Sequence, residues 1–290
     1  MKKAIFQLAL LITCLVSDLT AYQYQLSALA IFKNEADYLK EWIDYHLSIG
    51  VEHFILYNHR SDDNYKEILQ PYIELGLVEV HDWFSYEFPE AQIMAYKNAI
   101  TRTKNLTKWL AVIDLDEFIV PIVKDDIRDF LIDYEDYAGV VINWQLFGTS
   151  DIYCLPQGEW ITKHLIYKFP TFFDDPTWNS NRFVKSIIRP DRVEEHSKNP
   201  NCGNHIFEPI GKYTLVNSDK IRHPLSCKAK NILVDKIQLN HYWFRTIDWF
   251  FKHKLSRRGL VGDTYSIEKI GYLFKEGKAE IDLQILRFVK

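Results

Sequence analysis

The stretch WLAVIDLDEFIVP, residues 109–121, decides the fold of this chain. Its first five residues are apolar, which is typical of a buried β-strand, and Asp114 and Asp116 follow directly. Carboxylates at positions i and i+2 point to the same side of a strand's end, and such close like charges need a counter-charge. A hard divalent cation is a natural partner, whereas the plainer alternative is a pair of solvated acids.

The sequence before this stretch alternates apolar runs with amphipathic ones. The pattern predicts strands over residues 26–32, 51–57 and 77–80, and helices over residues 34–49, 65–75 and 89–103. Asn34 is a candidate helix cap and Gly50 a candidate helix stop. With residues 109–113 as the fourth strand, we expect a parallel sheet covered by helices on both faces. Ligands of such sheets bind outside the carboxyl ends of the strands, and this favours a functional role for the two aspartates.

The sequence after this stretch is less regular. It predicts strands over residues 139–147, 182–189 and 236–242, and a basic amphipathic helix over residues 248–258. Residues 151–181 are aromatic and rich in turn formers. Lys185 and Arg189 alternate on one strand, whose basic face either holds phosphate or faces solvent. We expect one α/β domain over residues 22–290, with a mostly parallel central sheet flanked by helices and an elaborated C-terminal half.

The composition is that of an ordinary globular protein. Of 290 residues, 47% are hydrophobic and 26% charged, and the formal net charge of −4 implies no basic surface for nucleic acid. Aromatic residues reach 15%; their faces suit sugar rings, although most are expected to fill the core. The four cysteines match no zinc motif. Outside the N-terminal segment, Cys154, Cys202 and Cys227 allow either one disulfide or buried free thiols.

Residues 1–21 have the pattern of a targeting signal. Lys2 and Lys3 precede an apolar run over residues 4–16, and small residues follow. This pattern predicts a cleaved signal peptide that sends the protein to the secretory pathway or the cell envelope. The alternative is a short anchor through residues 4–16, which would associate the protein with a membrane.

Phosphatases and mutases of the haloacid dehalogenase type also carry D-x-D after a strand, so they are a competing class. Their motif usually follows the first strand and continues with Thr or Val after one more residue. Here the motif follows the fourth predicted strand and continues with Glu117 and Phe118. The sequence therefore disfavours that class.

Several sequence blocks resemble glycosyltransferase family 92 and its bacterial relatives in the family 2-like group. The D-x-D region, residues 109–121, is one of them, and the others follow in the family's order. These are Lys33-Asn34-Glu35, Tyr38-Leu39, Glu41-Trp42, Tyr45-His46, Ser61-Asp62-Asp63-Asn64, Gln92-x-x-Ala95-Tyr96, Phe147-Gly148-Thr149-Ser150, residues 184–190 and Asn240-His241-Tyr242-Trp243. Together they cover about residues 26 to 260 and are far more specific than any single block.

This resemblance implies a GT-A fold, which is Rossmann-like, and a nucleotide-sugar donor, often UDP-linked. It implies a divalent ion, Mn²⁺ or Mg²⁺, with Asp116 as the principal ligand, Asp114 on the metal or the ribose, and His241 as a further ligand. The alternative for His241 is a packed histidine at a strand end. The residues expected to contact the base and ribose are Asn34, Glu35, Asp62, Gln92 and Asp114.

The resemblance also implies a reaction, the transfer of a hexose to a hydroxyl of a glycan, glycolipid or glycoprotein, with galactose as the favoured hexose. Inversion at the anomeric carbon, which the family favours, needs a carboxylate base near the accepting hydroxyl. The sequence leaves four candidates open: Asp151, Glu159, Asp174 and Asp175. Two rival functions also stay open, a metal-dependent hydrolase of phosphoesters or nucleotide sugars and a noncatalytic glycan-binding relative.

Overall fold

The computed structural model describes residues 22–175, 180–195, 202, 205–255 and 266–289. The targeting signal expected over residues 1–21 lies outside the described residues, and so do residues 256–258 of the predicted basic helix. Along the described ranges, we find no helix with the length and apolar character needed to cross a bilayer. The secretory location therefore stays a prediction.

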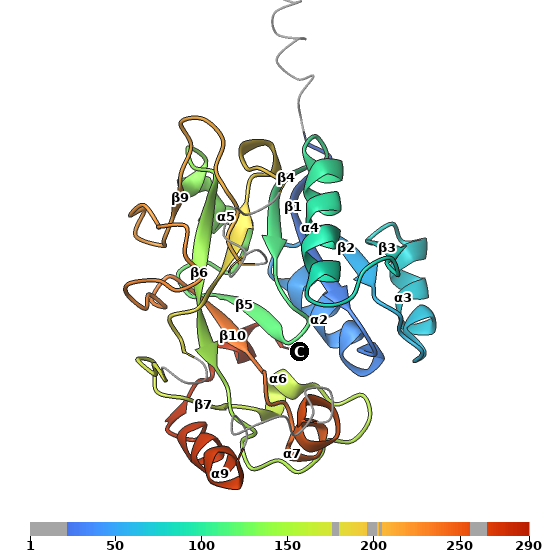
Figure 1. Ribbon diagram of the computed structural model, residues 1–290, viewed down its shortest axis with the longest axis vertical. Helices are drawn as coiled ribbons and strands as arrows, with labels where there is room; N and C mark the ends of the chain where they lie inside the picture. The colour runs from blue at the N-terminus through green and yellow to red at the C-terminus, as the bar shows by residue number, and fades with distance from the viewer. Residues whose placement is uncertain (1–21, 176–179, 196–201, 203–204, 256–265, 290) are drawn as a thin grey trace, which may run out of the picture.

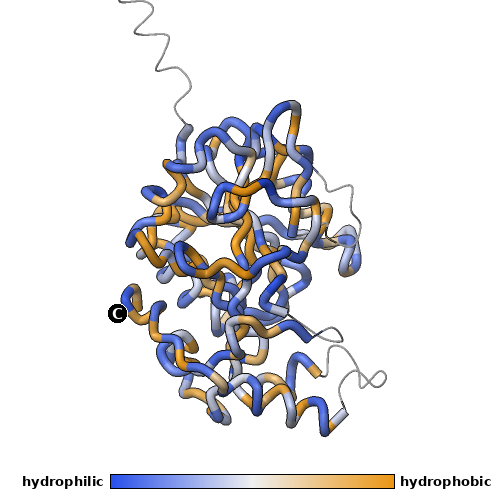
Figure 2. Tube along the Cα trace, turned by 90° about the vertical axis from the view of Figure 1, so that its left-hand side faces the viewer, coloured by the Kyte–Doolittle hydropathy of each residue, from blue (hydrophilic) through white to orange (hydrophobic). Residues whose placement is uncertain are grey.

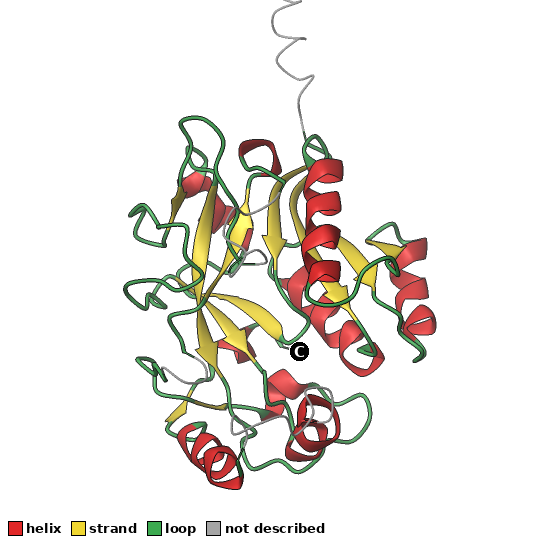
Figure 3. Ribbon diagram, in the orientation of Figure 1, coloured by secondary structure: helices red, strands yellow, loops and turns green. Residues whose placement is uncertain are grey.

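The chain folds around a twisted nine-stranded sheet with helices against it (Figure 1, Figure 3). The strand order is β3-β2-β1-β4-β8-β6-β10-β5, with β9 paired to β6, and β7 and β11 form a separate two-stranded sheet. The strands are β1 (Tyr24–Phe32), β2 (His53–Asn58), β3 (Val78–Asp82), β4 (Thr107–Val112), β5 (Glu117–Pro121), β6 (Gly139–Leu146), β7 (Tyr167–Lys168), β8 (Val184–Ile188), β9 (Leu215–Val216), β10 (Ile237–His241) and β11 (Glu280–Ile281). The main helices are α2 (Ala36–Ser48), α3 (Tyr65–Glu74), α4 (Glu90–Thr103), α5 (Ile127–Leu131), α6 (Ile161–His164), α7 (Ile247–Trp249) and α9 (Ile267–Glu276).

The first four strands form the parallel half of the sheet, which confirms the predicted alternation of strands and helices. Successive side chains of β1 pack on opposite sides of it. Leu26 and Ala28 join the cluster that contains α2 and α3, whereas Leu29 and Ile31 join the cluster that contains α4. Because both faces are covered, β1 is apolar along nearly its whole length. Figure 2 shows the hydrophobic segments running through the middle of the body.

The ends of α2 differ in part from expectation. Gly50 ends the helix as predicted, with a left-handed φ of 104° that favours glycine. Asn34 was expected to cap the helix, and this is wrong. The Ala36 N–H instead donates to Asp63 Oδ2 at 2.8 Å, because Asn34 has a φ of 56° and its side chain turns toward the loop after β2.

The second half of the sheet is mixed. The β8 strand is antiparallel to both β4 and β6, and β10 is parallel to β6 but antiparallel to β5. The sequence analysis assigned no element to residues 117–121, and the structure has strand β5 there, beginning at Glu117. Asp114 and Asp116 therefore lie in a turn between β4 and β5, where the chain passes from the parallel half to the mixed half.

Two further expectations are resolved in the C-terminal half. The predicted basic helix is short and irregular where it is described, with α7 followed by a π-helical turn over Phe250–Leu255. Cys202 and Cys227 form a disulfide with a Cα–Cα distance of 5.2 Å, which confirms the disulfide alternative. Cys154 is an exposed free thiol.

Candidate active site

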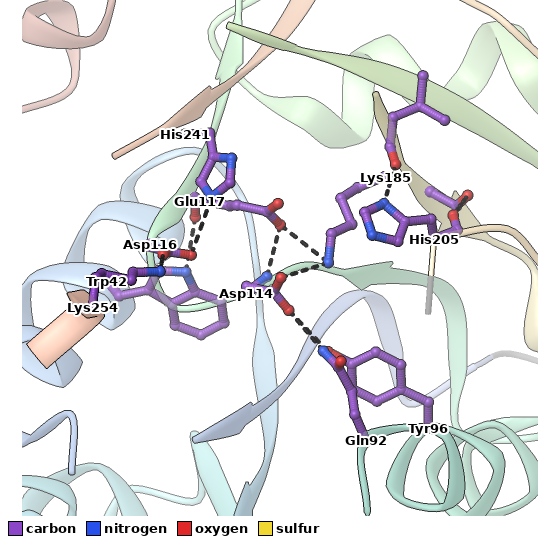
Figure 4. A network of polar contacts seen from close by, with 12 residues as sticks. Trp42, Gln92, Tyr96, Asp114, Asp116, Glu117, Lys185, His205, His241 and Lys254 are labelled. Carbon is purple, nitrogen blue, oxygen red and sulfur yellow. Dashed lines mark hydrogen bonds and ion pairs between the residues drawn. The ribbon is translucent and has the colours of Figure 1, made fainter. Parts of the chain in front are cut away.

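The turn that carries the two aspartates is held at both ends. The Asp114 N–H donates to Glu117 Oε2 at 2.8 Å, and the Tyr242 N–H, just after β10, donates to the Asp116 carbonyl oxygen at 2.8 Å. In Figure 4, Asp114 points toward Lys185 and Gln92, while the Asp116 side chain lies on the other side of the turn. The two carboxylates therefore have different partners.

Asp114 is held by three side chains from two elements. Lys185 Nζ of β8 lies 2.8 Å from Asp114 Oδ2, while Gln92 Nε2 and Tyr96 OH of α4 donate to Oδ1 at 3.1 and 3.2 Å. Burial alone would raise the pKa of Asp114, but the Lys185 ammonium outweighs it and keeps this pKa below its ordinary value. The side chain of Asp114 is 32% exposed, so a ligand can still reach it.

Lys185 also faces Glu117, a third acid of the site. Its Nζ lies 3.5 Å from Glu117 Oε2, and both side chains are fully buried. Burial raises the pKa of Glu117 to about 8, against the opposing effect of Lys185. Lys185 therefore does not face solvent, and its ammonium holds two acids within the protein.

Asp116 pairs with a lysine that is less buried than Lys185. Lys254 Nζ, from the π-helical turn, lies 2.9 Å from Asp116 Oδ2, and His241 Nε2 lies 3.5 Å from Oδ1. Burial would raise the pKa of Asp116, but Lys254 and His241 hold it well below its ordinary value. The Lys254 side chain remains 19% exposed, whereas that of Lys185 is fully buried. Of the two lysines, Lys254 is therefore the one less enclosed by the core.

His241 is placed by the register of β10. It pairs with Glu117 across the antiparallel ladder, so its ring arrives beside the acidic turn, and it packs on Trp144 with ring centroids 4.3 Å apart. Burial lowers the pKa of His241 despite the nearby Asp116 carboxylate. Its second ring nitrogen, Nδ1, is buried and has no hydrogen-bond partner among the described residues. Nε2, which faces Asp116, is the ring nitrogen placed to share a ligand with that carboxylate.

Glu35 contacts a residue that the sequence analysis did not single out. Arg245 Nη1 lies 2.6 Å from Glu35 Oε2, and the guanidinium carbon lies 3.7 Å from the centre of the Tyr38 ring and 4.2 Å from that of Trp249. Arg245 is almost fully buried. The signal that could have pointed to Arg245 and Lys254 as site residues is that both are basic and follow His241, the last residue of β10.

The remaining predicted nucleotide-contacting residues tie two loops together. The Asp62 N–H donates to Asn34 Oδ1 at 2.9 Å, and the Asn34 N–H donates to Ser61 Oγ at 2.9 Å. Asn34 and Asp62 thus follow β1 and β2 at the same edge of the sheet as the acidic turn. Both are far more exposed than Asp116, which suits residues that meet a ligand from solvent.

Asp174 and Asp175 are neighbours in the chain, and each of the four candidate bases has a basic partner. Asp151 pairs with Lys278, Glu159 with His164, Asp174 with Arg182, and Asp175 with Lys269. Glu159 also contributes to a cavity of about 370 Å³ whose wall includes Tyr38 and Trp249. The base stays a prediction with four candidates.

The metal prediction can be compared with the side chains at the turn. Nowhere in the described ranges do three His, Cys, Asp or Glu side chains gather in a way that could hold a metal ion. Asp116 and His241 do lie together, whereas Asp114 faces the other way. Proteins commonly hold Mg²⁺ with one or two carboxylates, and substrate phosphates supply the remaining ligands. The carboxylate of Asp116 and His241 Nε2, which face each other, therefore fit an ion that a diphosphate helps to bind.

The fold and the acidic turn define the class of α/β proteins that bind ligands at the carboxyl ends of parallel strands. The chain belongs to glycosyltransferase family 92, whose sequence model matches residues 27–250. A family 92 protein of Ricinus communis is 30% identical over an alignment of 252 residues, and the match covers 81% of this chain and 38% of that protein. This chain therefore spans well under half of that relative.

Two other similarities are more limited. A galactan beta-1,4-galactosyltransferase of Arabidopsis thaliana is 32% identical over 111 residues, covering 36% of this chain and 21% of that protein. The crystal structure of S. aureus TarS 1-349 aligns with 87% of this chain and 70% of its own, at 13% identity and a TM-score of 0.36. A likeness this slight carries no argument about function.

Proposed function

We propose that this protein is a metal-dependent glycosyltransferase that moves a hexose from a UDP-linked donor to a glycan or glycoconjugate hydroxyl, with inversion. Family membership supports transfer of a sugar. Galactose is the hexose we propose, because a relative matched over 111 residues is named a galactan galactosyltransferase. The observation that carries the proposal is the meeting of Asp116, His241 and Lys254 at the carboxyl edge of the sheet.

Each side chain has a task in this proposal. Asp116 and His241 would hold the divalent ion, which would neutralise charge on the departing diphosphate. Lys254 would leave Asp116 and turn its ammonium toward the same phosphates, because a second cation at Asp116 makes its position unfavourable. Asp114, kept ionised by Lys185, would accept hydrogen bonds from the donor's ribose hydroxyls.

The bond changes follow from inversion. The bond between the anomeric carbon and the diphosphate oxygen breaks, and the diphosphate keeps the electron pair. The accepting hydroxyl oxygen bonds to the anomeric carbon from the opposite face and loses its proton to a carboxylate. Glu159 is the candidate base that lies beside the site, since it shares a cavity wall with Tyr38 and Trp249.

A turnover experiment separates this proposal from its rivals. The protein is incubated with UDP-galactose and Mn²⁺, with and without a galactan oligosaccharide, and both released UDP and lengthened oligosaccharide are measured. We expect acceptor to stimulate UDP release and galactose to appear on the oligosaccharide with inverted configuration by NMR. Equal UDP release with and without acceptor would instead indicate a hydrolase. Oligosaccharide binding without turnover would indicate a noncatalytic relative.

A further inference from the structure

A cavity of about 370 Å³ is formed by three separate segments. They are the start of α2, the loop over residues 154–161, and residues 246–253 around α7. Two backbone hydrogen bonds join the last two segments, from the Ile247 N–H to the Ile152 carbonyl oxygen and from the Asp248 N–H to the Tyr153 carbonyl oxygen, both at 2.9 Å. The cavity is therefore a built part of the fold.

The cavity shares a wall with the candidate donor site. Tyr38 and Trp249 face the cavity, and the same two rings enclose the Arg245 guanidinium that pairs with Glu35. A few residues after Trp249, Lys254 reaches Asp116. The cavity and the candidate donor site are therefore adjacent at Tyr38 and Trp249.

The polar groups of the cavity suit hydroxyl groups. Asp37, Glu159 and Asp248 contribute carboxylates, which accept hydrogen bonds only. Lys252 neutralises Asp248 at 2.8 Å and His164 lies 3.1 Å from Glu159, but no described residue forms an ion pair with Asp37. The lining therefore carries surplus negative charge. It would repel uronates and phosphates, while the hydroxyls of a neutral sugar could donate to it.

We propose that this cavity binds the accepting saccharide and that it selects a neutral glycan over an acidic one. The proposal rests on the proposed function, because an acceptor is meaningful only for a transferase. It also gives Glu159 and Asp37 a concrete role as the carboxylates that accept hydrogen bonds from the sugar's hydroxyls. Tyr38 and Trp249 then border both the donor and the acceptor.

The test measures saccharide binding directly, so that it does not depend on turnover. Saturation-transfer NMR with a neutral galacto-oligosaccharide is applied to wild type, to Glu159→Gln and to Asp37→Asn. The matched control is Glu74→Gln, which changes an exposed carboxylate at the end of α3. Both side chains under test are exposed, so these variants are expected to fold. Because each test variant weakens one charge-assisted hydrogen bond, its affinity for the oligosaccharide should fall roughly 10- to 100-fold. The control should bind the oligosaccharide as tightly as wild type does.

Two further measurements assign a failure to its cause. The affinity for UDP is expected to stay unchanged in all three variants, and a galacturonate oligosaccharide of equal length is expected to bind more weakly than the neutral one. Unchanged oligosaccharide binding in both test variants, or preference for the acidic sugar, would overturn the cavity assignment. Normal oligosaccharide binding with no sugar transfer to any acceptor would instead overturn the proposed function and leave the cavity as a glycan site.

Discussion

At the scale of single residues, the site is organised by two aspartates that each have their own lysine. The Asp114–Lys185 pair includes a fully buried ammonium that also faces Glu117, so its geometry is fixed by the core. In the Asp116–Lys254 pair the lysine keeps some exposure and comes from a short helical segment, although Asp116 itself is buried. A fully buried ammonium is costly to remove from its partner, whereas one that keeps some contact with solvent is less costly to move. We therefore assign a holding role to Lys185 and a mobile role to Lys254.

Replacement of Lys254 by methionine tests this assignment. Without the ammonium, Asp116 is free for a cation, so Mn²⁺ alone should bind on the order of tenfold more tightly, while UDP without metal should bind more weakly by a similar factor. Isothermal titration of each ligand measures both changes, with Lys275→Met on the exposed side of α9 as the control. If Mn²⁺ affinity is the same in Lys254→Met as in wild type, Lys254 does not compete with a cation at Asp116.

At the scale of elements, helix α2 fixes strand β5 and thereby the acidic turn. Trp42 Nε1 donates to the Glu117 carbonyl oxygen at 3.0 Å, and Tyr45 OH donates to the Ile119 carbonyl oxygen at 2.8 Å. His46 Nδ1 lies 2.7 Å from the Trp42 carbonyl oxygen and donates to it, so its Nε2 is free to accept from the Ile119 N–H at 3.3 Å. The edge of β5 that does not pair with β10 is thus satisfied by side chains of one helix.

The neutral state of His46 predicts a pH dependence of stability. Burial lowers the pKa of His46 from 6.5 to about 3, so the unfolded chain takes up a proton below about pH 6.5 while the folded protein does not. The stability from this residue is therefore present at pH 7 and decreases as the pH falls, by about 2 kcal/mol at pH 5. Urea unfolding of wild type and His46→Gln at both pH values measures it. A wild type and a variant that lose equal stability between pH 7 and pH 5 would contradict a buried neutral His46.

The contacts between α2 and β5 also show which elements could be predicted from the sequence. The parallel half was predictable, because each apolar run is followed by an amphipathic helix and Gly50 and Gly76 mark two helix ends. Strand β5 was not predictable. Its residues 118–121 (FIVP) follow the acidic turn directly, and no glycine, proline or asparagine marks a turn between the fourth strand and this one. Its partners on α2 are more than 70 residues earlier in the chain, so no local pattern indicates them.

At the scale of the whole molecule, the site lies where the two halves of the sheet meet (Figure 1). The parallel half supplies the loops with Asn34 and Asp62, and the mixed half supplies Lys185 and His241. The resemblance led us to expect Asp116 beside His241, and the structure brings them within 3.5 Å of each other. The sequence does not identify which lysines pair with the two acids, because burial and pairing depend on contacts between distant segments. Lys185, for example, lies 71 residues after Asp114.

The central claim is that Asp116 holds a cation together with the diphosphate of the donor. Calorimetric titration of UDP, with and without Mn²⁺, into wild type and Asp116→Asn tests it most directly. We expect Mn²⁺ to tighten UDP binding to wild type on the order of tenfold or more, and to have no effect on the variant, whose circular dichroism remains that of wild type. An equal gain from Mn²⁺ in the folded Asp116→Asn variant would contradict the account.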